Sequence, residues 1–352
     1  MYVIISGCLT RGQCSSFVKQ IERSDHAAPM KPLPTRDLLR LRRALLAWYE
    51  ANRRELPWRR TRDPYRVWVS EIMLQQTRVG AVLPRYERFL QKFPSVEKLA
   101  AAKESSVLAE WSGLGYYRRA RNLHAAAKTL TGEHGGVFPG TARLWRELPG
   151  VGRYTAAAIS SIACGEPVAV LDGNVRRVIG RLGQTRSEAE SWSAAEALLD
   201  RDRPGDFNQA MMELGALVCL AGQPRCSSCP IQSFCRTCGK GRENRVAPAR
   251  ARREIAYALV RGHASLRLVR RAADDSLMAG MWELPQAKEV RASQRPLFTL
   301  RHSITVTDYV VSVVIQDHAA ATAGTWVRIS RLNRIPLTGL AKKILRRAQI
   351  IQ

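Results

Sequence analysis

The chain has 352 residues, enough for two ordinary domains, and 45% of them are hydrophobic, so each domain could bury a core. Lysine and arginine number 56 against 30 acidic residues, and this net charge of +26 favours nucleic acid over a neutral metabolite as partner. No apolar run is long enough to span a bilayer, and no secretion signal is recognisable. We exclude general disorder and a membrane protein, and we expect a soluble, cytoplasmic protein.

Residues 1–29 match no recognisable element and are expected to form a disordered extension, and Met30 is a second candidate for the native start. From Thr35 to about Cys238 the apolar spacing is helical almost throughout, with short Gly or Pro breaks. The pattern predicts helices over 36–52, 65–79, 81–92, 95–101, 104–112, 117–131, 141–147, 153–164, 172–182, 191–201 and 206–220. Residues 30–238 should therefore form an all-α domain.

The stretch from 239 to 253, GKGRENRVAPARARR, is basic and poor in apolar residues, and it predicts an exposed linker. After it, IAYALV (255–260), LRLVRR (266–271) and TDYVVSVVI (307–315) have the β-branched, apolar composition of strands. A basic helix is expected near 337–349. Residues 254–352 should form a small α+β domain.

Four cysteines follow the last predicted helix with the spacing C-x6-C-x2-C-x5-C: Cys219, Cys226, Cys229 and Cys235. Four thiolates suit either a cubane iron–sulfur cluster or a tetrahedral zinc ion. The zinc interpretation would use Cys238 in place of Cys219, giving two C-x2-C pairs. Unligated thiols are disfavoured because the surrounding polar turn residues offer no apolar burial. Ligand chemistry alone leaves both metals open.

The stretch LPGVGRYTA (148–156) joins two predicted helices through a turn that contains Gly150, Val151 and Gly152. Such glycines let the backbone approach a ligand, and the following helix N-terminus favours anions. By itself such a turn is more often simple helix punctuation. On a strongly basic chain, upstream of four cysteines, it predicts a clamp for DNA phosphate.

LPGVGRYTA, then LDGNVRRV (171–178), then C-x6-C-x2-C-x5-C resembles the helix-hairpin-helix superfamily of DNA glycosylases. The resemblance implies a mostly α, two-lobed domain with a [4Fe-4S] cluster held by Cys219, Cys226, Cys229 and Cys235. The cluster loop would help to present basic side chains to the DNA backbone.

Four further motifs resemble adenine DNA glycosylases of the MutY type: LPWR (56–59), WVSEIMLQQTRV (68–79), GLGYYRRARNL (113–123) and FNQAMMELGALVC (207–219). This resemblance covers most of residues 36–238. It implies an enzyme, expected to act as a monomer, that removes adenine from adenine:8-oxoguanine or adenine:guanine mispairs in double-stranded DNA. It also implies a Nudix-like 8-oxoguanine-recognition domain at 254–352.

Hydrolysis of an N-glycosidic bond needs an acid for the leaving base and a negative charge near the oxocarbenium-like sugar. Glu71 lies on an apolar predicted helix, where burial should raise its pKa, and the resemblance makes it the acid. An isolated glutamate on a helix is usually a solvated surface residue. The resemblance makes Asp172 the carboxylate facing the sugar, although it also fits a helix N-cap, and places Asn174 beside it to orient the reacting groups.

Relatives with lyase activity carry a hairpin lysine whose amine forms a Schiff base, and here that position is Tyr154. A phenol cannot form an imine, which favours a monofunctional glycosylase in which Tyr154 supports the aspartate. Half-buried packing at a helix start is the alternative role for this tyrosine.

Enzymes that act on a base within a duplex must extrude it and fill the vacated stack. The resemblance assigns this wedge role to Gln76 and Tyr116, and it assigns the adenine pocket to Trp58, Arg59 and Gln209. For each of these residues alone, an ordinary core or surface position would be the simpler interpretation.

In the C-terminal region, AGMWELPQ (279–286) resembles a turn of Nudix-like domains, without the glutamate-rich helix that would hold Mg²⁺. The family reads 8-oxoguanine with a Phe-Ser-His loop, whose nearest match is Leu300, Arg301 and His302. Only His302 is retained, and Arg301 could contact phosphate. Two other functions stay open: a pyrimidine-directed relative, and a non-catalytic DNA-binding protein that uses the hairpin and a zinc ribbon.

Overall fold

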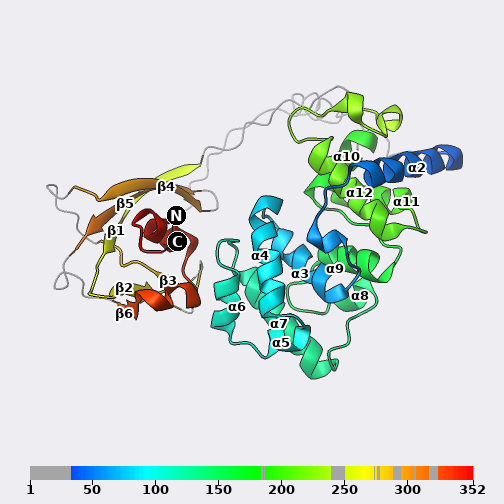
Figure 1. The fold of residues 1–352 in the computed structure, drawn as a ribbon. Coiled ribbons are helices and arrows are strands. Elements are labelled where there is room, and N and C mark those ends of the chain that lie inside the picture. Colours follow the sequence, from blue (N-terminus) through cyan, green and yellow to red (C-terminus); the bar gives the residue numbers. More distant parts are fainter. Residues whose placement is uncertain are drawn as a thin grey trace, which may run out of the picture.

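The computed structural model describes residues 33–183, 185, 187–238, 250–272, 274–275, 278–287, 295–304, 307–316 and 324–351. The extension expected at 1–29 lies outside these residues. Figure 1 shows a larger helical part and a smaller part that holds all the described strands. Within the described residues, none of the helices combines the length and the apolar character needed to cross a bilayer.

The helical part has two lobes, each with its own hydrophobic core. The first core holds the fully buried Trp68, Trp111 and Trp145. Its elements are η1 (Pro57–Arg59), α3 (Pro64–Leu74), α4 (Val79–Lys92), α5 (Val96–Ala100), α6 (Glu104–Glu110), α7 (Arg118–Glu133) and α8 (Ala142–Trp145). The second lobe consists of α2 (Thr35–Asn52), α10 (Gly173–Gly183), α11 (Glu188–Leu198) and α12 (Pro204–Leu217).

Helix α9 (Arg153–Ile159) joins the two lobes, followed by the π-helical turn η2 (Ser160–Cys164). Ala156 belongs to the first core, whereas Ala157 and Ala158 belong to the second. Because these side chains are small, one short helix can pack closely against both lobes at once. The first turn of α9 is thereby fixed at the junction of the lobes.

After α12 the four spaced cysteines lie in a loop with two single 3-10 turns, η3 (Cys226–Ser228) and η4 (Gln232–Phe234). Arg181 of α10 fastens this loop, donating to the carbonyl oxygens of Leu220 (2.7 Å) and Ala221 (3.2 Å). The loop is therefore built against the second lobe.

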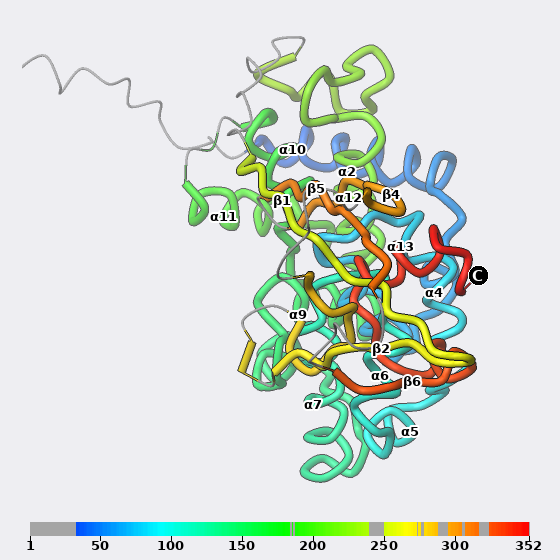
Figure 2. The backbone as a smooth tube through the Cα atoms, turned by 90° about the vertical axis from the view of Figure 1, so that its left-hand side faces the viewer, coloured from blue at the N-terminus to red at the C-terminus, as the bar shows by residue number. Residues whose placement is uncertain are grey.

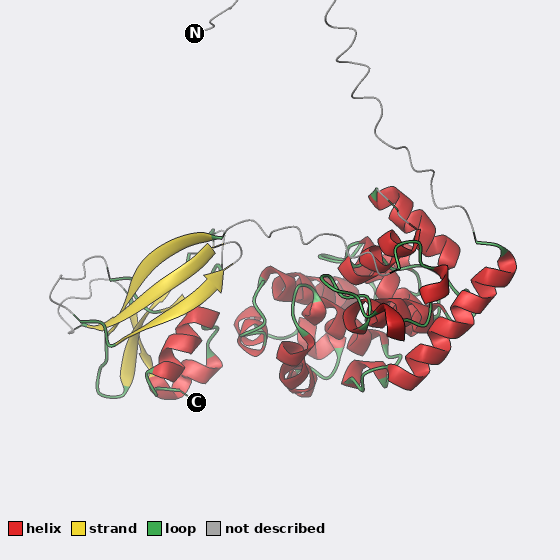
Figure 3. Cartoon of the chain, turned by 90° about the horizontal axis from the view of Figure 1, so that it is seen from above, coloured by secondary structure: helices red, strands yellow, loops and turns green. Residues whose placement is uncertain are grey.

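The C-terminal part has two three-stranded sheets, ordered β1-β5-β4 and β3-β2-β6. Strand β5 runs parallel to β1 and antiparallel to β4. Figure 3 shows the closing helix between the strands and the helical part. The elements are β1 (Ala251–Leu259), β2 (Ser265–Arg270), β3 (Trp282–Glu283), β4 (Phe298–Ile304), β5 (Thr307–Ile315), β6 (Thr325–Arg328), η6 (Ile329–Arg334) and α13 (Gly339–Arg347).

The linker expected at 239–253 needs one correction, because β1 begins at Ala251, where it pairs with Thr307. These residues form a strand because β5 pairs with them, and their polar composition alone does not predict it. The rest of the expected linker, apart from Arg250, lies outside the described residues.

The C-terminal part packs on the first lobe, and in Figure 2 its strands lie in front of the helices. The side chain of Met281 is fully buried within the core of the first lobe. The hydroxyl of Ser112 donates to the carbonyl oxygen of Leu337 at 3.0 Å, and Arg121 donates to that of Ala279. These contacts place the C-terminal part beside the loop between α6 and α7.

Candidate functional site

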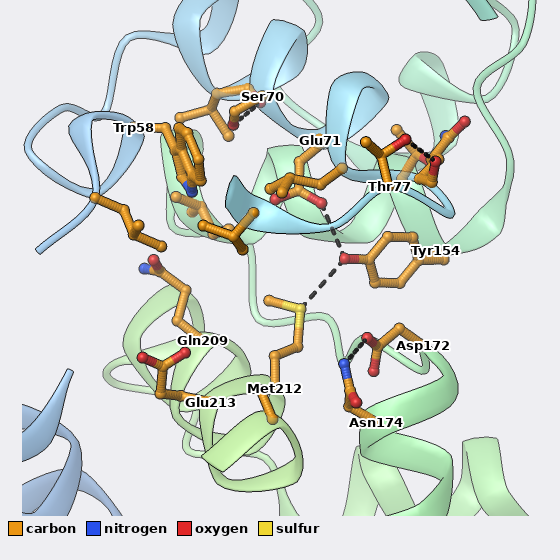
Figure 4. Close-up of a pocket in the computed structure, with 18 of the residues that line it drawn as sticks. Trp58, Ser70, Glu71, Thr77, Tyr154, Asp172, Asn174, Gln209, Met212 and Glu213 are labelled. Carbon is orange, nitrogen blue, oxygen red and sulfur yellow. Dashed lines mark hydrogen bonds between the residues drawn. The ribbon is translucent and has the colours of Figure 1, made fainter. Parts of the chain in front are cut away.

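A cavity of about 760 Å³ lies between the lobes, bordered by η1, α3, the 148–156 hairpin, the start of α10, and α12 (Figure 4). It brings together ten of the predicted site residues: Trp58, Arg59, Glu71, Gln76, Gly150, Gly152, Tyr154, Asp172, Asn174 and Gln209. Residues that are distant in sequence therefore converge on one site, as the motifs predict. Val151 of the same hairpin is buried in the first core, and Tyr116 and His302 lie outside the cavity lining.

Glu71 lies on α3, which begins cleanly because Asp63 caps it, accepting from the N–H of Arg66, and Pro64 occupies its first turn. The side chain is buried, with 6% of its surface exposed. Burial raises the pKa of Glu71 to about 7, against the opposing hydrogen bond from Tyr154. At neutral pH a large share of the molecules therefore carries a proton on this carboxyl group.

The Tyr154 hydroxyl lies 2.9 Å from Oε2 of Glu71 and 3.2 Å from Sδ of Met212 (Figure 4). Burial, together with the charges of Glu71 and Asp172, raises the pKa of Tyr154 well above its ordinary value, so the phenol stays neutral. Tyr154 was expected to support the aspartate. Its hydroxyl donates to the glutamate, because the first turn of α9 faces α3, and its support of the aspartate stays a prediction.

Asp172 caps α10, its Oδ1 accepting from the backbone N–H of Val175 at 2.7 Å. Its Oδ2 accepts from the side-chain amide of Asn174 at 2.9 Å. Burial raises the pKa of Asp172, while these hydrogen bonds oppose the rise. The helix-cap interpretation is confirmed, and the same residue also lines the cavity.

Helix α10 connects this carboxylate to the cysteine loop. The side-chain oxygen of Asn174 accepts from Arg177 at 2.8 Å, and the same guanidinium donates to the Cys219 carbonyl oxygen at 2.7 Å. Arg181 lies 3.3 Å from the Cys219 sulfur. A shift of the cysteine loop would therefore reach the cavity wall directly, through the contacts of Arg177 with Cys219 and Asn174.

One ionic group in the cavity was missed from sequence. Glu213 of α12 is 1% exposed and accepts from both Arg54 (2.6 Å) and Arg59 (2.8 Å). Burial would raise its pKa, but the two guanidinium groups outweigh this and hold it at about 2. The available signal was its position four residues after Gln209, on the same helix face. The two arginine partners lie more than 150 residues away in sequence, so they gave no signal that could have identified Glu213.

The backbone of the hairpin requires a glycine at one position. Gly150 has φ of +76°, and a Cβ there would lie 2.5 Å from that of Asn122. Any other residue would be both strained and in collision. The chain can therefore pass closely over α7, but the phosphate clamp itself stays a prediction.

The four spaced cysteines and Cys238 line a second, smaller pocket together with Arg181. Burial raises the pKa of the Cys229 thiol to about 11, and the nearby Cys219, Cys235 and Cys226 add to this rise. The cysteines thus share one pocket, although the part of the chain that the structure describes contains no group of three or more His, Cys, Asp or Glu side chains already arranged to hold a metal ion. Gln232 donates to the Cys238 sulfur at 3.2 Å.

The structure places Leu300, Arg301 and His302 in a strand and not in a loop, and their part in reading 8-oxoguanine stays a prediction. All three lie in β4, where His302 pairs with Tyr309 of β5 and Leu300 is buried in the C-terminal core. Burial and the charge of Lys343 lower the pKa of His302.

Known proteins are similar to this chain in sequence and in fold. Residues 69–201 match the family model described as HhH-GPD superfamily base excision DNA repair protein. The chain is 47% identical over 225 residues to adenine DNA glycosylase of Rattus norvegicus (58% of this chain, 44% of the relative). It is 39% identical over 298 residues to that of Arabidopsis thaliana (70% and 47%). The chain spans about half the length of these curated relatives.

Among solved structures, a thermostable thymine-DNA glycosylase is similar, with 30% identity and a TM-score of 0.54 over 57% of this chain and 96% of its own. A non-covalent endonuclease III–DNA complex shares the fold at 24% identity and a TM-score of 0.51, over 58% and 96%. The sequence match and the two-lobed helical fold agree. The chain belongs to the HhH-GPD superfamily of base excision DNA repair proteins.

Proposed function

We propose that this protein is a monofunctional DNA glycosylase that hydrolyses the N-glycosidic bond of adenine opposite 8-oxoguanine or guanine, acting as a cytoplasmic monomer. The observation that carries the proposal is the buried Glu71, whose pKa of about 7 keeps a proton available in the same cavity as Asp172. The similarity to adenine DNA glycosylases supports adenine as the base.

The chemistry follows from the two carboxyl groups. Glu71 donates its proton to a ring nitrogen of the extruded adenine, so that the base departs as a neutral molecule. Asp172, ionised and held by Asn174, stabilises the positive charge that develops on the sugar. Water then attacks the sugar carbon and returns a proton to Glu71. Trp58, Arg59 and Gln209 line the space for the base.

The proposal of a monofunctional enzyme rests on the nucleophile. No lysine is found among the described residues that line the cavity, and the hairpin position facing Glu71 is a tyrosine. Without an amine, the sugar cannot form an imine with the protein. Strand breaks should therefore appear only after alkali.

For the cysteine loop we propose a [4Fe-4S] cluster held by Cys219, Cys226, Cys229 and Cys235. The donor set fits in its chemistry, because the four cysteines line one pocket and Arg181 approaches the Cys219 sulfur. When bound, the cluster would brace the loop against α10. Cys219→Ser should lose absorbance near 400 nm and iron, while Cys238→Ser keeps both; the reverse pattern, with zinc in colourless protein, supports the zinc ribbon.

We further propose that the C-terminal part is a Nudix-like domain that contacts the base opposite the adenine. Its docking beside the α6–α7 loop, which carries Tyr116, supports this placement. A domain in this position can reach the opposite strand while the cavity holds the extruded base.

The deciding experiment is single-turnover base release from duplexes with adenine opposite 8-oxoguanine, guanine or thymine, together with a thymine:guanine duplex. We expect rapid release opposite 8-oxoguanine, slower release opposite guanine, and none from thymine:guanine. Release of thymine alone would support the pyrimidine-directed alternative. DNA binding without release from any duplex would support a non-catalytic protein.

A further inference from the structure

The guanidinium of Arg119, in the first turn of α7, joins two loops of the first lobe. Its Nη1 donates to the carbonyl oxygens of Ile72 (2.7 Å) and Met73 (2.9 Å). Its Nη2 donates to Thr77 Oγ1 (2.9 Å) and to the carbonyl oxygens of Leu114 (3.1 Å) and Gly115 (3.2 Å). One side chain therefore ties the end of α3 to the loop between α6 and α7.

These two loops carry the residues predicted to enter the base stack, Gln76 and Tyr116, which we name the wedge pair. Both have left-handed backbones, with φ of 52° and 47°. Non-glycine residues hold such strained conformations only where the surroundings enforce them. The Arg119 contacts fall directly beside both positions.

The charged guanidinium of Arg119 also contacts two aromatic rings. The guanidinium lies 5.3 Å from the ring centre of Trp111 and 5.5 Å from that of Tyr116. Burial lowers the pKa of Arg119 to about 10, so it stays charged at neutral pH. A lysine could not reproduce this planar fork of donors.

We propose that Arg119 is a positioning residue that holds the wedge pair in one fixed geometry, so that Gln76 and Tyr116 enter the duplex together as the base leaves. The inference rests on the proposed function. Arg119 makes its contacts with the protein and is not placed at the reacting atoms. Its removal should therefore impair base extrusion before it affects the chemistry.

The test measures extrusion directly, with 2-aminopurine in place of adenine opposite 8-oxoguanine. The fluorescence increase on unstacking is recorded at saturating protein, in a Glu71→Gln background that removes the proposed acid and keeps the base attached. We expect Arg119→Met and Arg119→Lys both to lose most of this increase. The control, Arg118→Met, removes an equal charge from an exposed neighbour and should retain it.

A double-mutant cycle in single-turnover adenine release, with Glu71 present, separates positioning from general destabilisation. Arg119→Lys should slow release by at least about tenfold, because several charge-assisted hydrogen bonds are lost. In a Tyr116→Ala background the same change should cost less than about threefold, since coupled residues are not additive. An equal loss in both backgrounds, or unstacking that matches Glu71→Gln alone, overturns the inference.

The outcomes also distinguish this inference from the proposed function. If the unaltered protein unstacks 2-aminopurine normally but releases no adenine from the duplex, the glycosylase proposal is refuted and the Arg119 fluorescence test still applies. Release with unaltered unstacking in the Arg119 variants would refute only the positioning role. If the Glu71→Gln protein itself leaves 2-aminopurine stacked, the wedge role and this inference both fail.

Discussion

Replacing Tyr154 by phenylalanine should move the pH dependence of base release to higher pH. The Tyr154 hydroxyl lies 2.9 Å from Glu71 and favours the ionised carboxylate, opposing the effect of burial. A hydrogen bond to a charged group contributes about 1.5–3 kcal/mol, and one pKa unit corresponds to about 1.4 kcal/mol. Without the hydroxyl, the pKa of Glu71 should rise above its value of about 7, by about one unit or more.

The assay is single-turnover adenine release across the pH range from about 5 to 9.5, because the rate then reports the protonation state of bound enzyme. Release by the unaltered protein should fall as pH rises through about 7, where Glu71 loses its proton. In Tyr154→Phe this fall should lie about one unit higher.

The matched control is Tyr65→Phe, on the same helix as Glu71. The Tyr65 hydroxyl donates to the carbonyl oxygen of Phe93 at 2.7 Å and is not part of the cavity lining. Its profile should coincide with that of the unaltered protein. If the fall in Tyr154→Phe stays in place or moves to lower pH, then Tyr154 does not stabilise the ionised Glu71 and the assignment of the acid is wrong.

Three further predictions concern stability. Because the pKa of Glu71 is raised, its contribution to the free energy of unfolding is full below about pH 4.5 and is lost as pH rises through about 7. Glu71→Gln cannot ionise, so at about pH 8 it should be more stable than the unaltered protein by up to about 3 kcal/mol in thermal unfolding. No difference between about pH 5 and 8 would contradict the buried, protonated state. Glu213→Gln leaves two arginines without their buried partner and should lower the free energy of unfolding by about 3 kcal/mol in urea titration; an unchanged midpoint would show that the ion pairs are not formed. Ser112→Ala removes a hydrogen bond to Leu337 and should weaken domain docking by about 1 kcal/mol, seen as faster amide exchange in the first turn of α13; unaltered exchange there would argue against this contact in solution.

Most helices could be predicted from sequence because their apolar period is long and uninterrupted. The prediction of 36–52 for α2 differs from Thr35–Asn52 by one residue. The prediction of 65–79 for α3 overran its end at Leu74. The five extra residues keep a helix-compatible composition, but Arg119 takes up carbonyl groups at the end of α3, and Gln76 turns left-handed. A contact from a distant helix decides this boundary.

Whether a strand could be predicted from sequence depends on how many of its residues are buried. Strand β5 was predicted with its observed bounds, because three of its residues are buried and its composition is strongly β-branched. Strand β4 was missed, since only Leu300 among its residues is buried and the remaining pattern is polar or mixed. Strands β3 and β6 have only 2 and 4 residues, too few to show a period. Short and largely exposed strands depend on their partners for definition.

Only part of the candidate site could be predicted from sequence, because contacts between residues far apart in the chain give no local signal. Glu71 and Asp172 are separated by a hundred residues of chain, and only the family resemblance links them before the fold does. Nothing local marks Glu213 as more than a helix residue, because its significance comes from two arginines at the other end of the domain. Ion pairs of high sequence separation leave no periodic signal.

The same two arginines explain how one cavity can hold carboxyl groups of opposite character. Glu213 accepts hydrogen bonds from both Arg54 and Arg59, and its pKa lies at about 2. Among the described residues, the hydrogen bond to the Glu71 side chain comes from a neutral phenol, so burial dominates and its pKa lies at about 7. Because Glu213 engages the guanidinium groups, Arg59 lowers the pKa of Glu71 only as a minor, distant charge. The fixed anion thus keeps the cations away from the acid, and the proton that base release requires stays on Glu71.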